Sequence, residues 1–271
     1  MTSSIPVGAM ASLATPTATG PSVTASTATM TRRGFLVAAT VAGPAVLAAC
    51  VGAPSNTPGA SGPGQAISLT FEGRPVRCLV HRAGKPADAA STLTIVLLHG
   101  ANTNASQWDD IGLAGVIANV DLSGPISSVV TIAPDIVDHS RGTPMVVETV
   151  APFVARHWGQ TNLAIGGISR GAAVALDVAE STGSSFRSVS LHSPALDLAH
   201  PIPPQPWVCW LDVGSADGLA DAAARAADAL RASGVVVVEH RWSGGHDRRY
   251  WRTHLPEYVG FHVAVADGRP L

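Results

Sequence analysis

Ser169 stands at the centre of residues 167–171, a G-x-S-x-G pattern that follows an apolar segment and precedes a run of small residues. The pattern predicts a nucleophile elbow, in which a sharp turn from strand to helix lifts the serine hydroxyl above a sheet. The helix expected at 170–180 directs its positive N-terminus and its free N–H groups at the place where an oxyanion would form. The predicted chemistry is nucleophilic attack by Ser169 on a carbonyl carbon, and the alternative is a glycine-rich turn with a buried serine.

A serine hydroxyl needs a general base to accept its proton, and His246 is the candidate for that role. His246 follows an apolar segment and two glycines, and it precedes a segment with the pattern of a terminal helix. A histidine on such a loop can reach back over the elbow. We interpret the nine other histidines as loop, strand-end, surface or interior residues.

Asp217 is the candidate for the acid that orients the base, since it lies just past a strand expected at 207–213. The serine, the acid and the base then follow one another in the order used by nucleophile-elbow enzymes. Asp217 could instead cap the helix expected at 219–232, and the two roles are compatible. Asp212 is the alternative acid, although it lies within the strand pattern. Asp247 is too close in sequence to His246 to orient it from behind.

The loop after the strand expected at 94–98 is the candidate for one half of an oxyanion hole. That strand ends in a His-Gly pair, and Gly100 would let the backbone approach a substrate. We expect backbone N–H groups of Ala101 and Arg170 to stabilise the oxyanion, with Asn102 as the alternative to Ala101. Candidate substrate-contacting side chains in this loop are Asn102, Asn104 and Trp108, and the alternative for them is loop capping by asparagine and a core tryptophan.

These residues resemble the alpha/beta-hydrolase superfamily, and within it the group that contains esterase D and the antigen 85 mycolyltransferases. The resemblance covers about residues 67–271 and rests on His99-Gly100, residues 167–171, residues 214–217, and Gly245-His246-Asp247 with Tyr250-Trp251 behind it. It implies ester hydrolysis or acyl transfer by Ser169, His246 and Asp217, without a metal or a cofactor. The catalytic region is near the minimum size for that fold, which implies a minimal lid or none.

Apolar runs and helical patterns alternate along this region, which predicts an α/β fold with a mostly parallel central sheet and helices on both faces. The motifs fall at the carboxyl ends of strands, where ligands bind in open sheets of this kind. Strands are expected at 67–71, 77–81, 94–98, 128–133, 163–166, 188–192, 207–213 and 235–241, and helices at 108–119, 145–157, 170–180, 219–232 and 248–266.

Residues 1–49 have the features of an export signal rather than of a folded domain. A twin-arginine motif begins at Thr31, an apolar run of about 15 residues follows, and a lipobox ends at Cys50. The run is shorter than the roughly 20 residues of a membrane-spanning helix. We expect export by the twin-arginine route and lipidation of Cys50 at the outer face of the cell membrane. The expected translation start is Met30, because residues 1–29 carry no charge.

Residues 50–65 then read as the lipidated cysteine and a flexible Gly/Pro/Ser tether, and residues 66–271 as one catalytic domain. The net charge is −2 and the chain has no basic stripe, so nucleic acid is not an expected partner. Cys78 and Cys209 lie in separate apolar segments and are expected to be buried free thiols. No spacing of cysteine and histidine indicates a metal site.

The leading hypothesis is a serine esterase that is anchored to the membrane and acts on small or medium acyl esters in the cell envelope. The first alternative is an acyltransferase acting on envelope lipids or sugars, which would use the same acyl-enzyme. The second alternative is a lipoprotein that binds a ligand on a hydrolase scaffold without catalysis.

Overall fold

The computed structural model describes residues 64–85, 88–159, 161–196 and 202–271. By its contacts the chain divides into two units, Met1–Pro54 and Ser55–Leu271, and every described residue lies in the second. The expected export signal, Cys50 and the tether up to residue 63 lie outside the described residues. Within the described part of the chain, no helix is both long and apolar enough to cross a membrane.

Eight strands form one sheet in the order β1-β2-β4-β3-β5-β6-β7-β8. β1 and β2 are antiparallel to their neighbours, and all other neighbouring pairs are parallel, as the alternating pattern predicts. The strands are β1 (Gln65–Phe71), β2 (Arg74–Gly84), β3 (Thr92–Leu98), β4 (Ser128–Pro134), β5 (Asn162–Ile168), β6 (Ser188–His192), β7 (Val208–Gly214) and β8 (Val236–Trp242). The central strands β3, β4, β5 and β6 are buried along their whole length, which explains their continuous apolar sequence.

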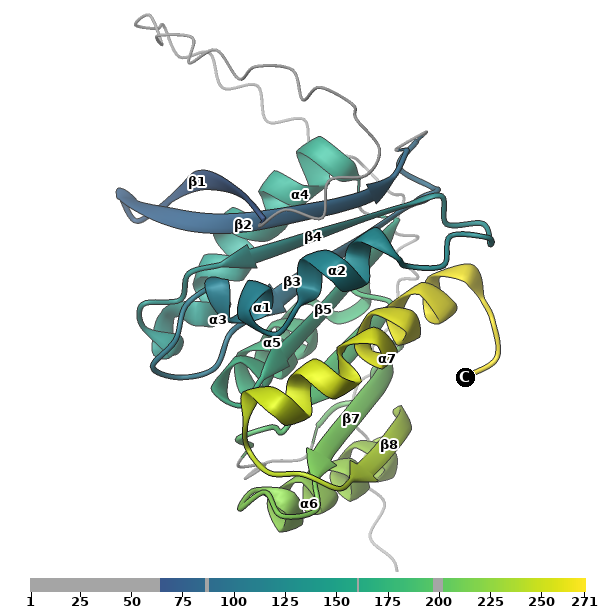
Figure 1. Ribbon diagram of the computed structural model, residues 1–271. Coiled ribbons are helices and arrows are strands. Elements are labelled where there is room, and N and C mark those ends of the chain that lie inside the picture. The colour runs from purple at the N-terminus through teal and green to yellow at the C-terminus, as the bar shows by residue number, and fades with distance from the viewer. Residues whose placement is uncertain (1–63, 86–87, 160, 197–201) are drawn as a thin grey trace, which may run out of the picture. The chain divides into compact units, whose positions relative to one another are not determined.

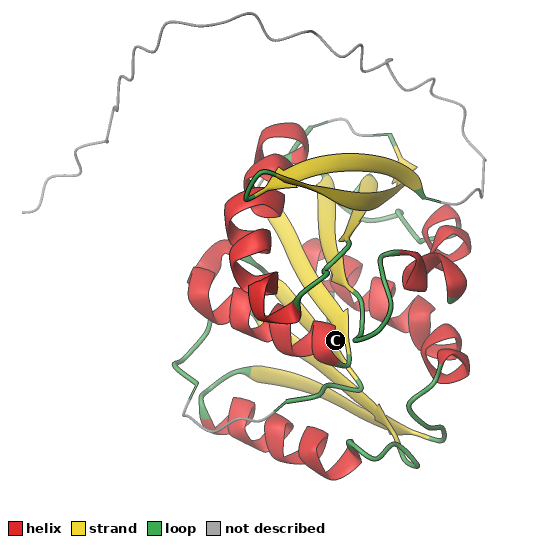
Figure 2. Ribbon diagram, turned by 90° about the vertical axis from the view of Figure 1, so that its left-hand side faces the viewer, coloured by secondary structure: helices red, strands yellow, loops and turns green. Residues whose placement is uncertain are grey.

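Helices cover both faces of this sheet (Figures 1 and 2). One face carries α1 (Ser106–Asp110), α2 (Leu113–Ala118) and α7 (Arg248–Asp267), which pack on it through one apolar cluster. The other face carries α3 (Gly142–Met145), the π-helix η2 (Val146–Val150), α4 (Ala151–Trp158), α5 (Arg170–Thr182) and α6 (Ala220–Ala232). Two short 3-10 turns, η1 (His139–Arg141) and η3 (Gly183–Ser185), complete the elements of the described residues.

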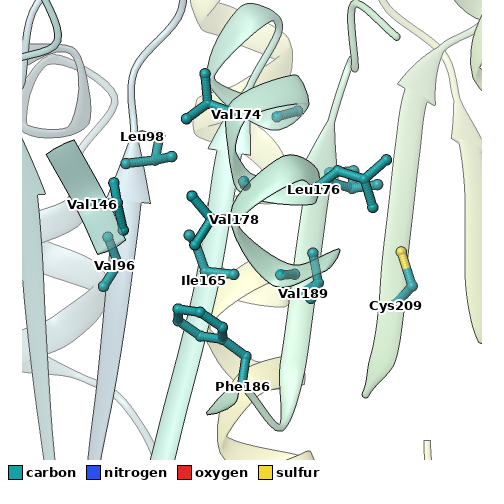
Figure 3. Close-up of a cluster of buried hydrophobic side chains, with 14 of the residues drawn as sticks. Val96, Leu98, Val146, Ile165, Val174, Leu176, Val178, Phe186, Val189 and Cys209 are labelled. Carbon is teal, nitrogen blue, oxygen red and sulfur yellow. The ribbon is translucent and has the colours of Figure 1, made fainter. Parts of the chain in front are cut away.

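The apolar core beneath α5 packs this helix against the sheet. Val174 and Val178 of α5 pack against strand residues such as Ile165 and Val189 in one buried cluster (Figure 3). Cys78 of β2 and Cys209 of β7 both belong to this cluster, but four strands lie between β2 and β7. The two cysteines are buried free thiols, as predicted, and burial raises the pKa of the Cys78 thiol to about 12.

Two predicted helices differ from the observed ones in their continuity. The helix expected at 108–119 is divided into α1 and α2 by Gly112, whose φ of 97° is incompatible with a continuous helix. The helix expected at 145–157 contains η2 just before α4. Pro152 has no N–H to donate to the carbonyl of Glu148, so the regular hydrogen-bond ladder cannot continue there.

Candidate active site

Ser169 occupies the turn between β5 and α5 with a backbone conformation that L-residues rarely adopt, φ 55° and ψ −117°. A Cβ at Gly167 would overlap the backbone of Gly171, and a Cβ at Gly171 would overlap the carbonyls of Leu98 and His99. Both glycines of the motif are therefore required for the turn to close. The result is the strand-turn-helix arrangement that the motif predicts, with Ser169 half-buried at the carboxyl end of the sheet.

His246 reaches Ser169 from the loop between β8 and α7. Its Nε2 lies 3.1 Å from Ser169 Oγ, within hydrogen-bond distance. Asp247 caps α7 by accepting the N–H of Tyr250, which fixes the residue next to the histidine. The ring of Trp251 packs edge-on against the imidazole at 5.1 Å between centroids. About a third of the His246 side chain (35%) remains exposed, so solvent reaches this group.

Asp217 lies behind His246, in the turn between β7 and α6. Its Oδ2 is 2.8 Å from Nδ1 of His246, and its side chain is almost completely buried. Its Oδ1 accepts the N–H of Leu219, which is the N-cap residue of α6. Because Asp217 accepts a hydrogen bond from the N–H of Nδ1 in this arrangement, Nε2 is left free to accept the hydroxyl proton of Ser169. The structure thus brings the three residues selected from the sequence into one hydrogen-bonded chain.

Asp212, the alternative acid, lies elsewhere. Its carboxylate is fully buried and contacts His192 of the neighbouring strand, with 2.6 Å between Nδ1 and Oδ1. It also accepts hydrogen bonds from Tyr250 and Tyr258 of α7. Burial and the negative charge of Asp212 raise the pKa of the Tyr250 hydroxyl well above its usual range, so the phenol stays a proton donor. The Asp212 carboxylate therefore makes structural contacts, and it makes no hydrogen bond to His246.

The loop after β3 lies against the elbow, as expected for an oxyanion-hole loop. A Cβ built on Gly100 would be only 3.6 Å from Cβ of Ser169 and 3.5 Å from the carbonyl oxygen of Ile168. The N–H of Gly100 is already engaged, because it donates to Oε1 of Gln107 at 2.8 Å. Among the described residues, no partner is found for the N–H groups of Ala101 and Arg170. Arg170 is the first residue of α5, where an N–H has no carbonyl in its own helix to pair with.

Trp108 corrects one prediction from the sequence. We expected it to contact substrate, but it is completely buried in the apolar cluster between α1, α2, α7 and the sheet. No part of its surface is available to a substrate, so Trp108 is a core residue. Asn104 caps its own loop by accepting the N–H of Ser106 at 2.9 Å. Asn102 is exposed with a φ of 59°, a left-handed conformation that asparagine tolerates better than most residues, and its role in substrate binding stays a prediction.

Three functional candidates were missed by the sequence reasoning: His99 as a hydrogen-bonding residue, Thr103 and Gln107. All three surround the Gly100 peptide. Their spacing over the loop and the start of α1 carries no signal, because the loop bends back on itself.

In the part of the chain that the structure describes, no group of His, Cys, Asp and Glu side chains could hold a metal ion. A hollow of about 520 Å³ around Leu163 and Phe186 lies at the opposite end of β5 from Ser169 and does not belong to this site.

Neither a protein-family model nor a curated protein matches this chain. Solved structures do match it. The fluorophosphonate-binding serine hydrolase F of Staphylococcus aureus aligns with a TM-score of 0.60 at 16% identity, over 74% of this chain and 99% of that one. A ferulic acid esterase aligns with a TM-score of 0.59 at 17% identity, over 74% and 99%.

The chain has the alpha/beta-hydrolase fold. The S-formylglutathione hydrolase of Staphylococcus aureus also shares this fold, with a TM-score of 0.55 at 17% identity over 73% of this chain and 96% of that one. In an alpha/beta-hydrolase fold the elbow serine stands at the carboxyl ends of the strands, which is where Ser169 lies. The connection between β6 and β7, where this hydrolase fold could carry a lid, includes residues 197–201, which are not described, so the expectation of a minimal lid stays a prediction.

Proposed function

We propose that this protein is a serine carboxylic-ester hydrolase that works through an acyl-enzyme on Ser169. The observation that carries the proposal is the hydrogen-bonded chain from Ser169 Oγ to His246 Nε2 (3.1 Å) and from His246 Nδ1 to Asp217 Oδ2 (2.8 Å). A nucleophile, a base and a group that orients the base are the minimum that acyl transfer to serine requires. Esterases among the solved structures with this fold support the same assignment.

The proposed reaction begins when Ser169 Oγ attacks the ester carbonyl carbon and its proton passes to Nε2 of His246. The carbonyl oxygen becomes an oxyanion, and the N–H groups of Ala101 and Arg170 stabilise it. Asp217 keeps the proton of Nδ1 in place and stabilises the imidazolium that forms. When the intermediate collapses, the C–O bond to the alcohol breaks, and His246 gives its proton to the departing oxygen.

The second half of the reaction releases the acyl group. A water molecule attacks the carbonyl carbon of the acyl group on Ser169, and His246 accepts one of its protons. The bond between that carbon and Oγ of Ser169 then breaks, His246 returns the proton to Oγ, and the carboxylic acid leaves. The exposure of His246 supports water as the acceptor, because a drier site would favour transfer to another alcohol. Hydrolysis is therefore the function that the geometry supports best.

Hydrolysis of p-nitrophenyl esters from C2 to C16 tests this proposal. We expect activity that is lost in Ser169→Ala and kept in Ser184→Ala, an exposed serine of η3 that serves as the matched control. The chain-length optimum would report the depth of the acyl site. A folded wild-type protein without activity on any of these esters would contradict the proposal, and so would full activity in Ser169→Ala.

We further propose that the enzyme acts in the cell envelope, held at the outer face of the membrane by a lipid on Cys50. The support is the order of a twin-arginine motif, an apolar run and a lipobox in the sequence. Metabolic labelling with an alkyne fatty acid in cells tests it, with Cys50→Ser as the control. We expect label on the wild-type protein only, in the membrane fraction, and equal labelling of Cys50→Ser would overturn the proposal.

A further inference from the structure

The backbone of Gly100 is held by side chains from its own loop and from the start of α1. The carbonyl oxygen of Gly100 accepts a hydrogen bond from Oγ1 of Thr103 at 2.9 Å, and it lies 2.8 Å from Nδ1 of His99. On the other side of the residue, the N–H of Gly100 donates to Oε1 of Gln107 at 2.8 Å. The backbone groups of Gly100 are thus paired in a buried setting before any substrate arrives.

The tautomer of His99 follows from its second ring nitrogen. Nε2 accepts the N–H of Ile136 at 2.8 Å, so it carries no proton. The proton of the neutral ring is then on Nδ1, which donates to the Gly100 carbonyl. Burial lowers the pKa of His99, which keeps the ring neutral and this tautomer in place.

Thr103 links the two sides of this arrangement. Its hydroxyl lies 2.9 Å from the Gly100 carbonyl oxygen and 3.1 Å from Oε1 of Gln107. Gln107 is buried, whereas Thr103 is an exposed residue whose hydrogen bond to the Gly100 carbonyl is partly buried. The single proton of this hydroxyl faces two acceptors, the Gly100 carbonyl oxygen and the Gln107 oxygen that accepts the Gly100 N–H, so Thr103 contacts both sides of Gly100.

Fixing the Gly100 carbonyl also fixes the N–H of Ala101. The two groups belong to one planar trans peptide, in which the C=O and the N–H point in opposite directions. Gly100 lies directly beside Ser169, with 3.6 Å from its Cβ position to Cβ of Ser169. Because the N–H of Gly100 is engaged by Gln107, the next N–H along this loop is that of Ala101, which has no hydrogen-bond partner among the described residues.

We propose that Thr103 and Gln107 are positioning residues of the oxyanion hole, which orient the Gly100–Ala101 peptide so that its N–H faces the reacting carbonyl. The inference rests on the proposed esterase function and adds two residues that do not touch substrate. Preorganised donors act on charge that develops in the transition state, so their loss lowers kcat more than it changes KM.

The decisive variants are Thr103→Val and Thr103→Ser, measured on p-nitrophenyl acetate beside Ser106→Ala, a control at the first residue of α1. Valine keeps the size of the side chain without the hydroxyl, whereas serine keeps the hydroxyl. We expect Thr103→Val to lower kcat by about 10-fold, with KM nearly unchanged, since the peptide is loosened rather than removed. Thr103→Ser and Ser106→Ala should retain wild-type kcat.

Inhibition by a trifluoromethyl ketone whose other substituent is a methyl group separates the two roles. A residue that only stabilises the fold would not change the inhibition constant Ki. The ketone forms a tetrahedral adduct with the serine, so its Ki should rise in Thr103→Val by the factor by which kcat/KM falls. Gln107→Met should show the same parallel change. Wild-type kcat and Ki in Thr103→Val would overturn the inference, provided the wild type is active. An inactive, folded wild type would instead contradict the esterase function itself.

Discussion

Nδ1 of His192 lies 2.6 Å from Oδ1 of Asp212, and neither side chain is exposed to solvent. This His–Asp pair sits on β6 and β7 and is separate from the pair formed by His246 and Asp217. Asp212 accepts three further hydrogen bonds, from the indole of Trp210 and the hydroxyls of Tyr250 and Tyr258, at 2.8 to 2.9 Å. Four donors around one buried carboxylate satisfy its charge and tie α7 to the sheet. The two pairs therefore have different tasks, one structural and one proposed as catalytic.

Asparagine substitutions separate these two tasks. Asp217→Asn should lower kcat by about 10⁴-fold, because the amide favours the wrong tautomer of the base, while the free energy of unfolding changes little. Asp212→Asn should lower the free energy of unfolding by about 2 to 4 kcal/mol, because it removes charge-assisted hydrogen bonds and sets an amide donor against other donors. Ester hydrolysis and urea unfolding measure the two effects. The reverse pattern would make Asp212 the catalytic acid.

Two glycine-to-alanine substitutions should have opposite effects on stability. Gly167→Ala places a methyl group into the backbone of Gly171 and should cost at least about 2 kcal/mol. Gly260→Ala lies within α7, where nothing beyond the backbone of the helix itself lies within 4 Å of the new methyl group, and it should stabilise the protein by about 0.5 to 1 kcal/mol. Thermal unfolding measures both. Equal melting temperatures for the two variants would show that the elbow is not as tightly packed as described.

The stability of the fold should depend on pH through His262. This residue of α7 is buried, and its ring nitrogens contact the hydroxyls of Ser188 and Ser190 at 2.7 and 2.9 Å. Burial lowers the pKa of His262 from 6.5 to about 3. The unfolded chain then binds a proton below about pH 6.5 that the folded chain does not bind, so stability is complete above that pH and is lost as the pH falls toward 3.

For one such group the free energy of unfolding falls by about 1.4 kcal/mol for each pH unit below 6.5. In His262→Gln this contribution is removed, so the free energy of unfolding should fall less steeply between pH 6.5 and 4.5. Urea unfolding at pH 7.5, 6.5, 5.5 and 4.5 compares the two slopes, whatever the absolute stability of the variant. Identical slopes in both proteins would mean that His262 binds a proton in the folded state.

The sequence was sufficient where a local pattern determines the structure. Apolar runs separated by helical patterns predicted the parallel sheet, and the glycines around Ser169 predicted the elbow, because both depend on neighbouring residues. The reach of His246 was predicted from its place in a glycine-containing loop after an apolar strand, and the structure brings its Nε2 to 3.1 Å from Ser169 Oγ across 77 residues.

The sequence was insufficient where contacts depend on how elements dock. The orientation of Trp108 toward the core is decided by the packing of α1 and α2 against α7, which no local pattern reveals. The tyrosines that surround Asp212 come from a helix 38 and 46 residues further along the chain. The polar contacts of Thr103 and Gln107 likewise arise only when the loop folds back over Gly100.

Covalent labelling of Ser169 is the most direct test of the central claim, that this serine is a nucleophile activated by His246. The full-length protein is treated with a fluorophosphonate and digested, and the modified peptide is identified by mass spectrometry. We predict a single adduct on Ser169, no adduct in Ser169→Ala, much slower labelling in His246→Ala, and wild-type labelling in Ser184→Ala. A folded protein that stays unlabelled, or that is labelled equally well in Ser169→Ala, would contradict the account.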